Sequence, residues 1–115
     1  MKINGVKAVD YLSKLSDRVL LFKKDNTDYF WSYKLKSAKK TEFAFDPRTT
    51  TGLFVRVDRM PPNLPGIVDI EKISSKGVST ALARVFSGGL HCANFVCTIE
   101  NEEALESFLS YYESL

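Results

Sequence analysis

The chain has 115 residues with a formal net charge of +2, and 44% of its residues are hydrophobic and 26% charged. This length predicts one globular domain over residues 1–115, which buries roughly two thirds of its surface around one core. The composition is too apolar for a disordered chain and too evenly interrupted by charges for a membrane span, so we expect a soluble protein without a membrane partner.

The first predicted elements are a helix and a β-hairpin. Asn4 is a candidate N-cap for a helix that extends to about Leu15 and carries apolar residues at helical spacing. Residues 18–24 have apolar side chains on both faces, which predicts a central strand. A polar turn joins this strand to a second one at residues 29–36, so the pair predicts a hairpin.

Two more alternating segments, at residues 41–46 and 52–59, extend the hairpin to a meander of antiparallel strands. Residues 60–66 contain three prolines and predict a stiff surface loop. Residues 67–73 then predict a short edge strand.

The remaining elements are a helix at 78–86, an apolar strand at 90–99, and a last helix that begins after Asn101. Glu102 and Glu103 suit the first turn of this last helix because their charge opposes the positive end of its dipole. The sequence therefore predicts an α+β fold, in which a mainly antiparallel sheet of about five strands packs against three helices. We expect the order helix, four strands, a short edge strand, helix, strand, helix.

The cysteine pattern predicts free, buried thiols and no metal site. Cys92 and Cys97 lie in one predicted strand, about 16 Å apart and on opposite faces, so they cannot form a disulfide with each other. His91 adjoins Cys92, and no spaced pair of further ligands follows. The N-terminal segment lacks the hydrophobic stretch of a secretory signal, so we expect a cytoplasmic protein, and no motif predicts a cofactor.

Charge is distributed unevenly along the chain. Residues 1–60 carry thirteen basic and seven acidic residues, which gives +6, whereas residues 61–115 carry three and seven, which gives −4. Such polarity predicts an anionic partner for the first half, or neutralisation of the two halves within the fold. Self-association is a third reading, in which the basic half of one copy contacts the acidic last helix of another.

Nucleic-acid binding is one alternative function. The lysine-rich hairpin region interleaves basic residues with aromatic ones, but strand alternation places Trp31 and Tyr33 opposite Lys34. Only Phe30 shares the lysine face, so binding would rest on attraction to phosphate rather than on base stacking. The candidate residues are Lys23, Lys24, Lys34, Lys36, Lys39 and Lys40.

A second alternative is a small-anion or small-molecule binder, or an enzyme, with its pocket at the start of the helix predicted at 78–86. Hydroxyls, a lysine and a glycine meet free backbone donors there, although we favour an ordinary helix cap as the explanation for them. His91 would line this pocket, but His91 and Cys92 face opposite sides of a strand and make a poor catalytic dyad. The candidate anion-binding residues are Ser75, Lys76, Gly77, Ser79 and Thr80.

The favoured function is a non-enzymatic binding or accessory module that acts through a protein partner or as a homodimer. Two loops combine arginines with flexible apolar groups, a mixture that suits protein recognition. The residues expected to be exposed there are Arg48, Arg56, Arg59, Met60 and Leu64.

Overall fold

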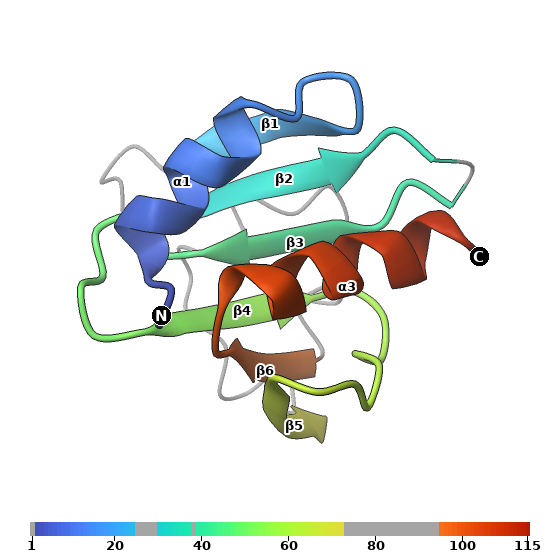
Figure 1. Ribbon diagram of the computed structural model, residues 1–115. Helices are drawn as coiled ribbons and strands as arrows, with labels where there is room; N and C mark the ends of the chain where they lie inside the picture. The colour runs from blue at the N-terminus through green and yellow to red at the C-terminus, as the bar shows by residue number, and fades with distance from the viewer. Residues whose placement is uncertain (1, 25–29, 38, 73–94) are drawn as a thin grey trace.

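One antiparallel sheet carries the described helices on one face in the computed structural model (Figure 1). The structure describes residues 2–24, 30–37, 39–72 and 95–115, with the backbone alone at residues 23 and 24. In chain order the elements are α1 (Gly5–Ser13), β1 (Val19–Lys24), β2 (Trp31–Leu35), β3 (Glu42–Phe45), β4 (Leu53–Val57), β5 (Ile67–Lys72), β6 (Phe95–Ile99) and α3 (Glu102–Glu113).

The sheet has six strands in the order β1-β2-β3-β4-β6-β5, and each strand pairs antiparallel with its neighbours. The first four strands are the predicted meander, and β6 enters the sheet between β4 and β5. The α+β class is therefore confirmed, with six strands where the sequence predicted about five. The helix predicted at 78–86 lies outside the described residues.

The prediction of a central strand at residues 18–24 is wrong. β1 stands at one end of the strand order, and Leu20 and Leu21 are 49% and 39% exposed. The opposite end is β5, as the predicted edge strand at 67–73 requires. An apolar run on both faces does not identify a strand's neighbours, because these are set by pairing with segments distant in sequence.

Both described helices begin at the predicted caps. The Asn4 side chain accepts a hydrogen bond from the backbone N–H of Lys7 at 2.9 Å, and Asn101 accepts one from Ala104 at 2.8 Å. These bonds satisfy backbone donors that have no partner within the first helical turn. α1 ends at Ser13, slightly before the predicted end at Leu15.

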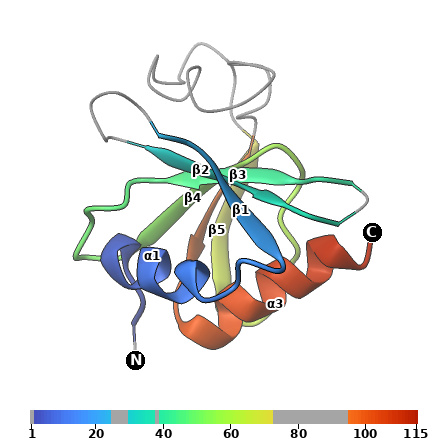
Figure 2. The same cartoon turned by 90° about the horizontal axis from the view of Figure 1, so that it is seen from above.

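The core lies between the sheet and the helices, which occupy the same side of the sheet in Figure 2. Tyr33 stacks on Phe43 and Phe45 with ring centroids 5.6 and 5.5 Å away, and Phe108 of α3 meets Phe43 edge-on. The Tyr112 hydroxyl donates to the carbonyl oxygens of Arg59 and Met60, so α3 also holds the start of the proline loop. The sheet face opposite the two described helices is called the outer face below.

Candidate functional site on the outer sheet face

Two rows of side chains cross the outer face of β4, β6 and β5. The first row is Phe54, Thr98 and Val68, and the second is Arg56, Val96 and Glu71, as the pairing registers show. Directly opposed residues in antiparallel strands share a face and lie about 5 Å apart. Phe54 is 52% exposed and Val68 36%, so exposed apolar side chains stand at both ends of the first row, and Arg56 and Glu71 stand at the ends of the second.

A β-bulge in β5 places Glu71 in the second row. The β5 register shifts between Val68 and Glu71, and Asp69 within this shift has a φ of 53°. Strict alternation from Val68 would have placed Ile70 on the outer face and Glu71 on the side of the helices. Asp tolerates this left-handed conformation better than most residues, because its short side chain bonds locally. The bulge thus places Glu71 in the same row as Arg56, with β6 between their two strands.

A hollow of about 540 Å³ lies over these rows. β4, β6 and β5 supply its floor, and Phe30 and the segment after β3 complete the described wall. Its described lining is Phe30, Asp46, Thr49, Phe54, Val55, Arg56, Asp69, Glu71, Val96, Cys97 and Thr98. The hollow combines aromatic and aliphatic carbon with an arginine and carboxylates, a lining typical of recognition sites.

Arg56 is the cation among the described residues that line the hollow. Its Nη1 atom is buried without a hydrogen-bond partner among the described groups, and burial lowers the pKa of the guanidinium. A desolvated donor without a partner is costly, and an acceptor that approached it would recover that cost. Asp46, at the rim, accepts hydrogen bonds from Arg48, so its charge is already paired.

A second, shallower hollow of about 520 Å³ adjoins the first at Asp69, which borders both. Met60, which is 57% exposed, and Val68 give it exposed apolar carbon. Its described lining is Met60, Pro61, Asn63, Ile67, Val68, Asp69 and Ile70. Val68 therefore belongs both to the first row and to the lining of this shallow hollow by the proline loop.

The structure separates the predicted protein-binding residues. Arg56 lines the large hollow and Met60 the shallow one, whereas Arg48 and Arg59 are exposed outside both. The expected exposure of Leu64 is wrong, because Leu64 is half-buried and packs against the core. Arg56 is also half-buried rather than exposed.

Phe54 and Val68 were not predicted as candidate site residues, and Glu71 was interpreted as a solvated charge on an edge strand. A large aromatic ring among the polar alternate positions of residues 52–59 was the available signal for Phe54. The position of Glu71 on the outer face was not predictable from the sequence, because it depends on the bulge in β5.

The lysines predicted for nucleic acid lie at the other end of the sheet. Lys23 and Lys24 belong to β1, and Lys39 and Lys40 lie exposed between β2 and β3. Lys34 lies 4.5 Å from the centroid of the Phe22 ring, and the Lys36 ammonium donates to the Ser16 carbonyl. Tyr33 is buried on the opposite face from Lys34, as alternation predicted. Nucleic-acid binding through these lysines stays a prediction.

The alternative anion site falls outside the described residues, as do His91 and Cys92. Its residues Ser75, Lys76, Gly77, Ser79 and Thr80 therefore stay predictions. Cys97 is buried with a free thiol, as predicted, and burial raises the pKa of that thiol to about 12. The Cys97 thiol is thus poorly suited to nucleophilic chemistry at neutral pH. In the part of the chain that the structure describes, no three or more His, Cys, Asp or Glu residues gather around a metal position.

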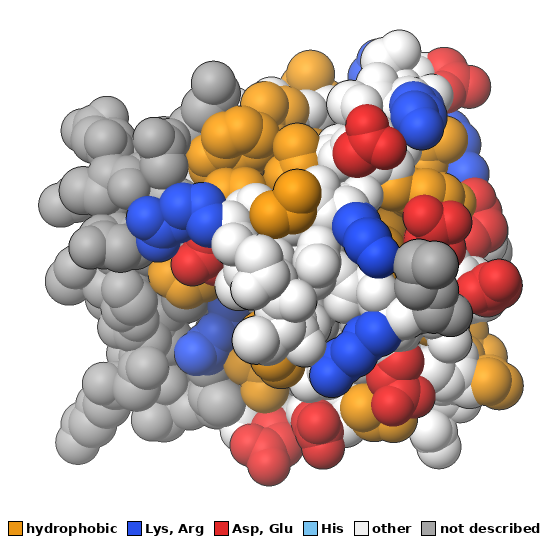
Figure 3. All heavy atoms as spheres, turned by 60° about the vertical axis from the view of Figure 1, so that its left-hand side comes forward, with side chains coloured by type: hydrophobic (Ala, Val, Ile, Leu, Met, Phe, Trp, Pro, Cys, Tyr) orange, Lys and Arg blue, Asp and Glu red, His pale blue; other side chains and the backbone are white. Residues whose placement is uncertain are grey.

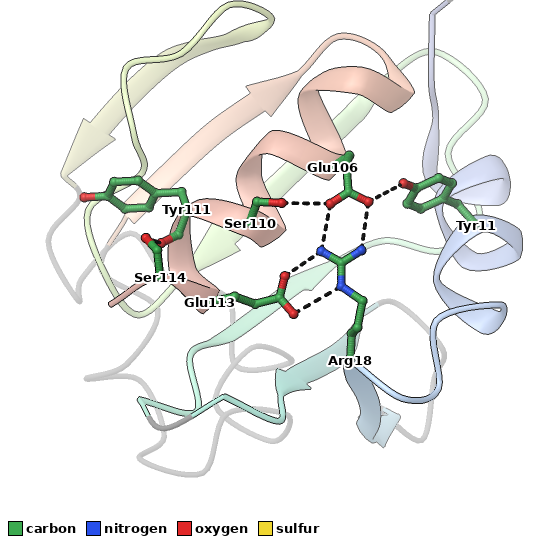
Figure 4. A network of polar contacts seen from close by, with 7 residues as sticks. All are labelled: Tyr11, Arg18, Glu106, Ser110, Tyr111, Glu113 and Ser114. Atoms are coloured by element: carbon green, nitrogen blue, oxygen red, sulfur yellow. Dashed lines mark hydrogen bonds and ion pairs between the residues drawn. The ribbon is translucent and has the colours of Figure 1, made fainter.

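The acidic last helix is partly neutralised within the chain (Figure 4). Arg18, just before β1, donates paired hydrogen bonds to Glu106, with Nη1–Oε1 and Nη2–Oε2 distances of 2.8 and 2.7 Å. Its Nε and Nη2 atoms also bond Glu113, and the hydroxyls of Tyr11 and Ser110 donate to Glu106. Two glutamates of α3 are therefore engaged by one arginine of the first half.

We expect Arg18→Ala to lower the free energy of unfolding by about 1–2 kcal/mol, since two carboxylates lose their shared cation and solvent screens much of the effect. The hydrogen bonds from Arg18 hold the pKa of Glu106 at about 2, below its ordinary 4.5. This contribution is present above pH 4.5 and is lost as the pH falls toward 2. Urea unfolding at pH 7 and pH 3 measures the effect, which should shrink by about half at pH 3.

Lys14→Ala is the matched control, because the Lys14–Asp10 pair lies on the surface with both side chains over 70% exposed. This control should change the free energy of unfolding by no more than a few tenths of a kcal/mol. Equal effects of the two variants would contradict a structural role for the Arg18 network.

Charge is mixed over the side of the molecule drawn in Figure 3, where Lys and Arg side chains alternate with Asp and Glu. A group of hydrophobic side chains is exposed on the same side. The uneven charge of the sequence therefore does not appear as a block of one sign on this view.

Compared with protein-family models, curated proteins and solved structures, the chain matches none. No helix within the described ranges is long and apolar enough to cross a membrane.

Proposed function

We propose that this chain is a binding module that recognises a protein through the outer face of β4, β6 and β5. The observation that carries the proposal is the pair of exposed apolar side chains Phe54 and Val68 on this face, beside a hollow that Arg56 lines, with the exposed Met60 in the adjoining shallow hollow. Exposed apolar strips rimmed by polar groups are characteristic of protein interfaces, where aromatic and arginine side chains contribute most of the binding energy.

The composition of the face favours a protein over nucleic acid. Asp69 and Glu71 stand on β5, and their charges would repel phosphates. The exposed lysines Lys39 and Lys40 lie by the β2–β3 turn, several strands away from β5 in the sheet. A partner with apolar groups and both signs of charge suits this face best.

The backbone that presents these residues is held firmly, because β4 and β6 are interior strands of the sheet. Leu53, Val55 and Val57 of β4 are buried against the helices, so alternate residues of the same strand are presented outward at set positions. A presented face of this kind loses little conformational freedom on binding.

Photo-crosslinking from position 54 tests the proposal. We expect a benzophenone side chain introduced at Phe54 to give a covalent protein adduct in cells, because the ring would lie inside the interface. Position 68 should give the same adduct, since Val68 lies in the same row. Denaturing gels and mass spectrometry of the adduct measure the yield and identify the captured chain.

Position 6 is the matched control, because Val6 on α1 is 51% exposed, nearly the same as Phe54. Position 111 is the matched control for position 68, because Tyr111 is 37% exposed and Val68 is 36% exposed. Crosslinking that is absent at positions 54 and 68, or equally strong at positions 6 and 111, would refute the outer face as the recognition surface.

A further inference from the structure

A groove of about 380 Å³ lies on the helix side of the sheet, between α1 and the β1–β2 pair. Leu21 of β1 pairs in register with the buried Tyr33 of β2 and so shares its face, yet Leu21 is 39% exposed. This exposure shows that the groove is open to solvent at β1, and its volume lies within the range of small-molecule sites. Its apolar wall consists of Val9, Leu12, Val19, Leu21, Trp31 and Tyr33.

The wall contains one hydrogen-bond donor that the fold does not use. Tyr33 is only 4% exposed, and its hydroxyl makes no hydrogen bond with the described part of the chain. Burial raises the pKa of this hydroxyl to about 12, so it keeps its proton at neutral pH. The Tyr33 ring is held in place by stacking on Phe43 and Phe45. Because buried tyrosine hydroxyls usually find a partner, an acceptor on a bound molecule would complete this site.

Lys36 places a positive charge at the rim of the groove. Its ammonium donates to the Ser16 carbonyl oxygen just after α1. An ammonium has three donors, so two remain for another acceptor. Within the described ranges no carboxylate forms an ion pair with Lys36. Three residues of extended chain separate Lys36 from Tyr33, about 10 Å, so an anionic group held between these two long side chains can accept from both.

We propose that this groove binds a small aliphatic carboxylate, with its hydrocarbon chain between α1 and β1 and its carboxylate at Tyr33 and Lys36. Leu12, Leu21 and Trp31 offer the chain an apolar surface, and each methylene removed from water adds to the affinity. A neutral apolar molecule would leave the Lys36 charge unused, whereas a phosphate or sulfate ion would gain nothing from the apolar wall. The site lies on the opposite side of the sheet from the outer face and is independent of the proposed function.

Titration of the purified chain with octanoate, below the concentration at which it forms micelles, tests the proposal. Trp31 is the only tryptophan in the sequence and lines the groove, so its fluorescence should change and reach saturation. Isothermal titration calorimetry measures the same binding without relying on the indole. Octanol has the same chain without the charge and should bind about tenfold more weakly, because charge-assisted hydrogen bonds are the stronger ones.

Three substitutions in the groove should weaken octanoate binding. Tyr33→Phe removes only the unused hydroxyl and keeps the ring stack, so binding should fall about tenfold while the urea midpoint stays unchanged. Lys36→Met removes the rim charge and should weaken binding several-fold. Leu21→Glu places a carboxylate in the groove and should abolish binding, at a position exposed enough for the variant to fold.

The controls make the same changes outside the groove. Tyr111→Phe on α3 matches Tyr33→Phe, Lys39→Met between β2 and β3 matches Lys36→Met, and Val6→Glu on α1 matches Leu21→Glu. All three positions are exposed, and their variants should bind octanoate as the wild type does. Circular dichroism checks that every variant folds.

Octanoate that gives neither a saturable fluorescence change nor a binding heat overturns the proposal. Binding that survives both Tyr33→Phe and Leu21→Glu overturns it equally, because octanoate would then occupy another place. Octanol that binds as tightly as octanoate rejects the carboxylate as the recognised group. A protein captured by a benzophenone side chain at position 21, without octanoate binding, would assign the groove to a partner chain instead.

Discussion

Phe108→Ala should lower the free energy of unfolding by about 3–5 kcal/mol, which is a large part of the stability of a domain of this size. Phe108 is fully buried on α3, with ring centroids 5.4 Å from Phe43 and 5.0 Å from Tyr112. Its removal leaves a cavity between α3 and the sheet that rigid neighbours cannot fill. Urea or thermal unfolding followed by circular dichroism measures the loss.

Val6→Ala provides the comparison, because Val6 lies on α1 with half of its surface exposed. That variant should stay within about 0.5 kcal/mol of the wild type. A loss below about 1 kcal/mol for Phe108→Ala would show that α3 does not pack on β3 as the ring contacts require.

Asp58→Asn should raise the free energy of unfolding at pH 7 and above by about 1–2 kcal/mol, after allowance for solvent screening. Asp58 follows β4, and its Oδ1 atom is buried without a hydrogen-bond partner among the described groups. Burial raises the pKa of this carboxyl from 3.8 to about 6, and the nearby charge of Glu42 adds to the rise while Arg59 opposes it.

The sign of the effect follows from which state holds the proton. Below pH 3.8 the carboxyl is neutral in both states, so the full stability is present. As the pH rises through about 6, the folded chain releases a proton that the unfolded chain has already lost, and stability falls. The asparagine side chain stays neutral, so the variant should match the wild type near pH 4 and exceed it above pH 6.

Urea midpoints at pH 4, 6 and 8 measure this difference, with Asp17→Asn as the control at an exposed carboxylate. The control should leave the pH dependence of stability unchanged. A variant that is less stable than the wild type at pH 8 would show that the ionised Asp58 contributes favourably to the fold. The Asp58 effect opposes that of Glu106, whose ionised form stabilises the protein.

The helices were largely predictable because their signals are local. Asn4 and Asn101 cap the two described helices, and the apolar residues of α3 that recur at helical spacing are all buried, namely Ala104, Leu105, Phe108, Leu109 and Tyr112. Capping bonds and helical periodicity involve residues within a few positions of one another, so a linear pattern records them. Alternation likewise predicted which side chains of β4 enter the core, whereas in β3 the residues of both faces are buried.

The candidate site was not predictable to the same degree, because it brings together residues of three strands. Arg56 was predicted as an exposed candidate, yet its neighbours Val96 and Glu71 come from strands that are distant in sequence. The entry of β6 between β4 and β5 creates those neighbours. Strand order depends on pairing between segments that are distant in sequence, so neither composition nor hydrophobic periodicity predicts it.

The uneven charge of the two halves also separates what the sequence determines from what tertiary packing determines. The sequence by itself determined the α+β class, the helix caps, the alternation of the strands and the excess of basic residues before residue 60. Only the tertiary structure decided that Arg18 neutralises Glu106 and Glu113, and that a bulge at Asp69 turns Glu71 outward. Local patterns follow from the geometry of a few consecutive residues, whereas these contacts exist only once distant segments have packed together.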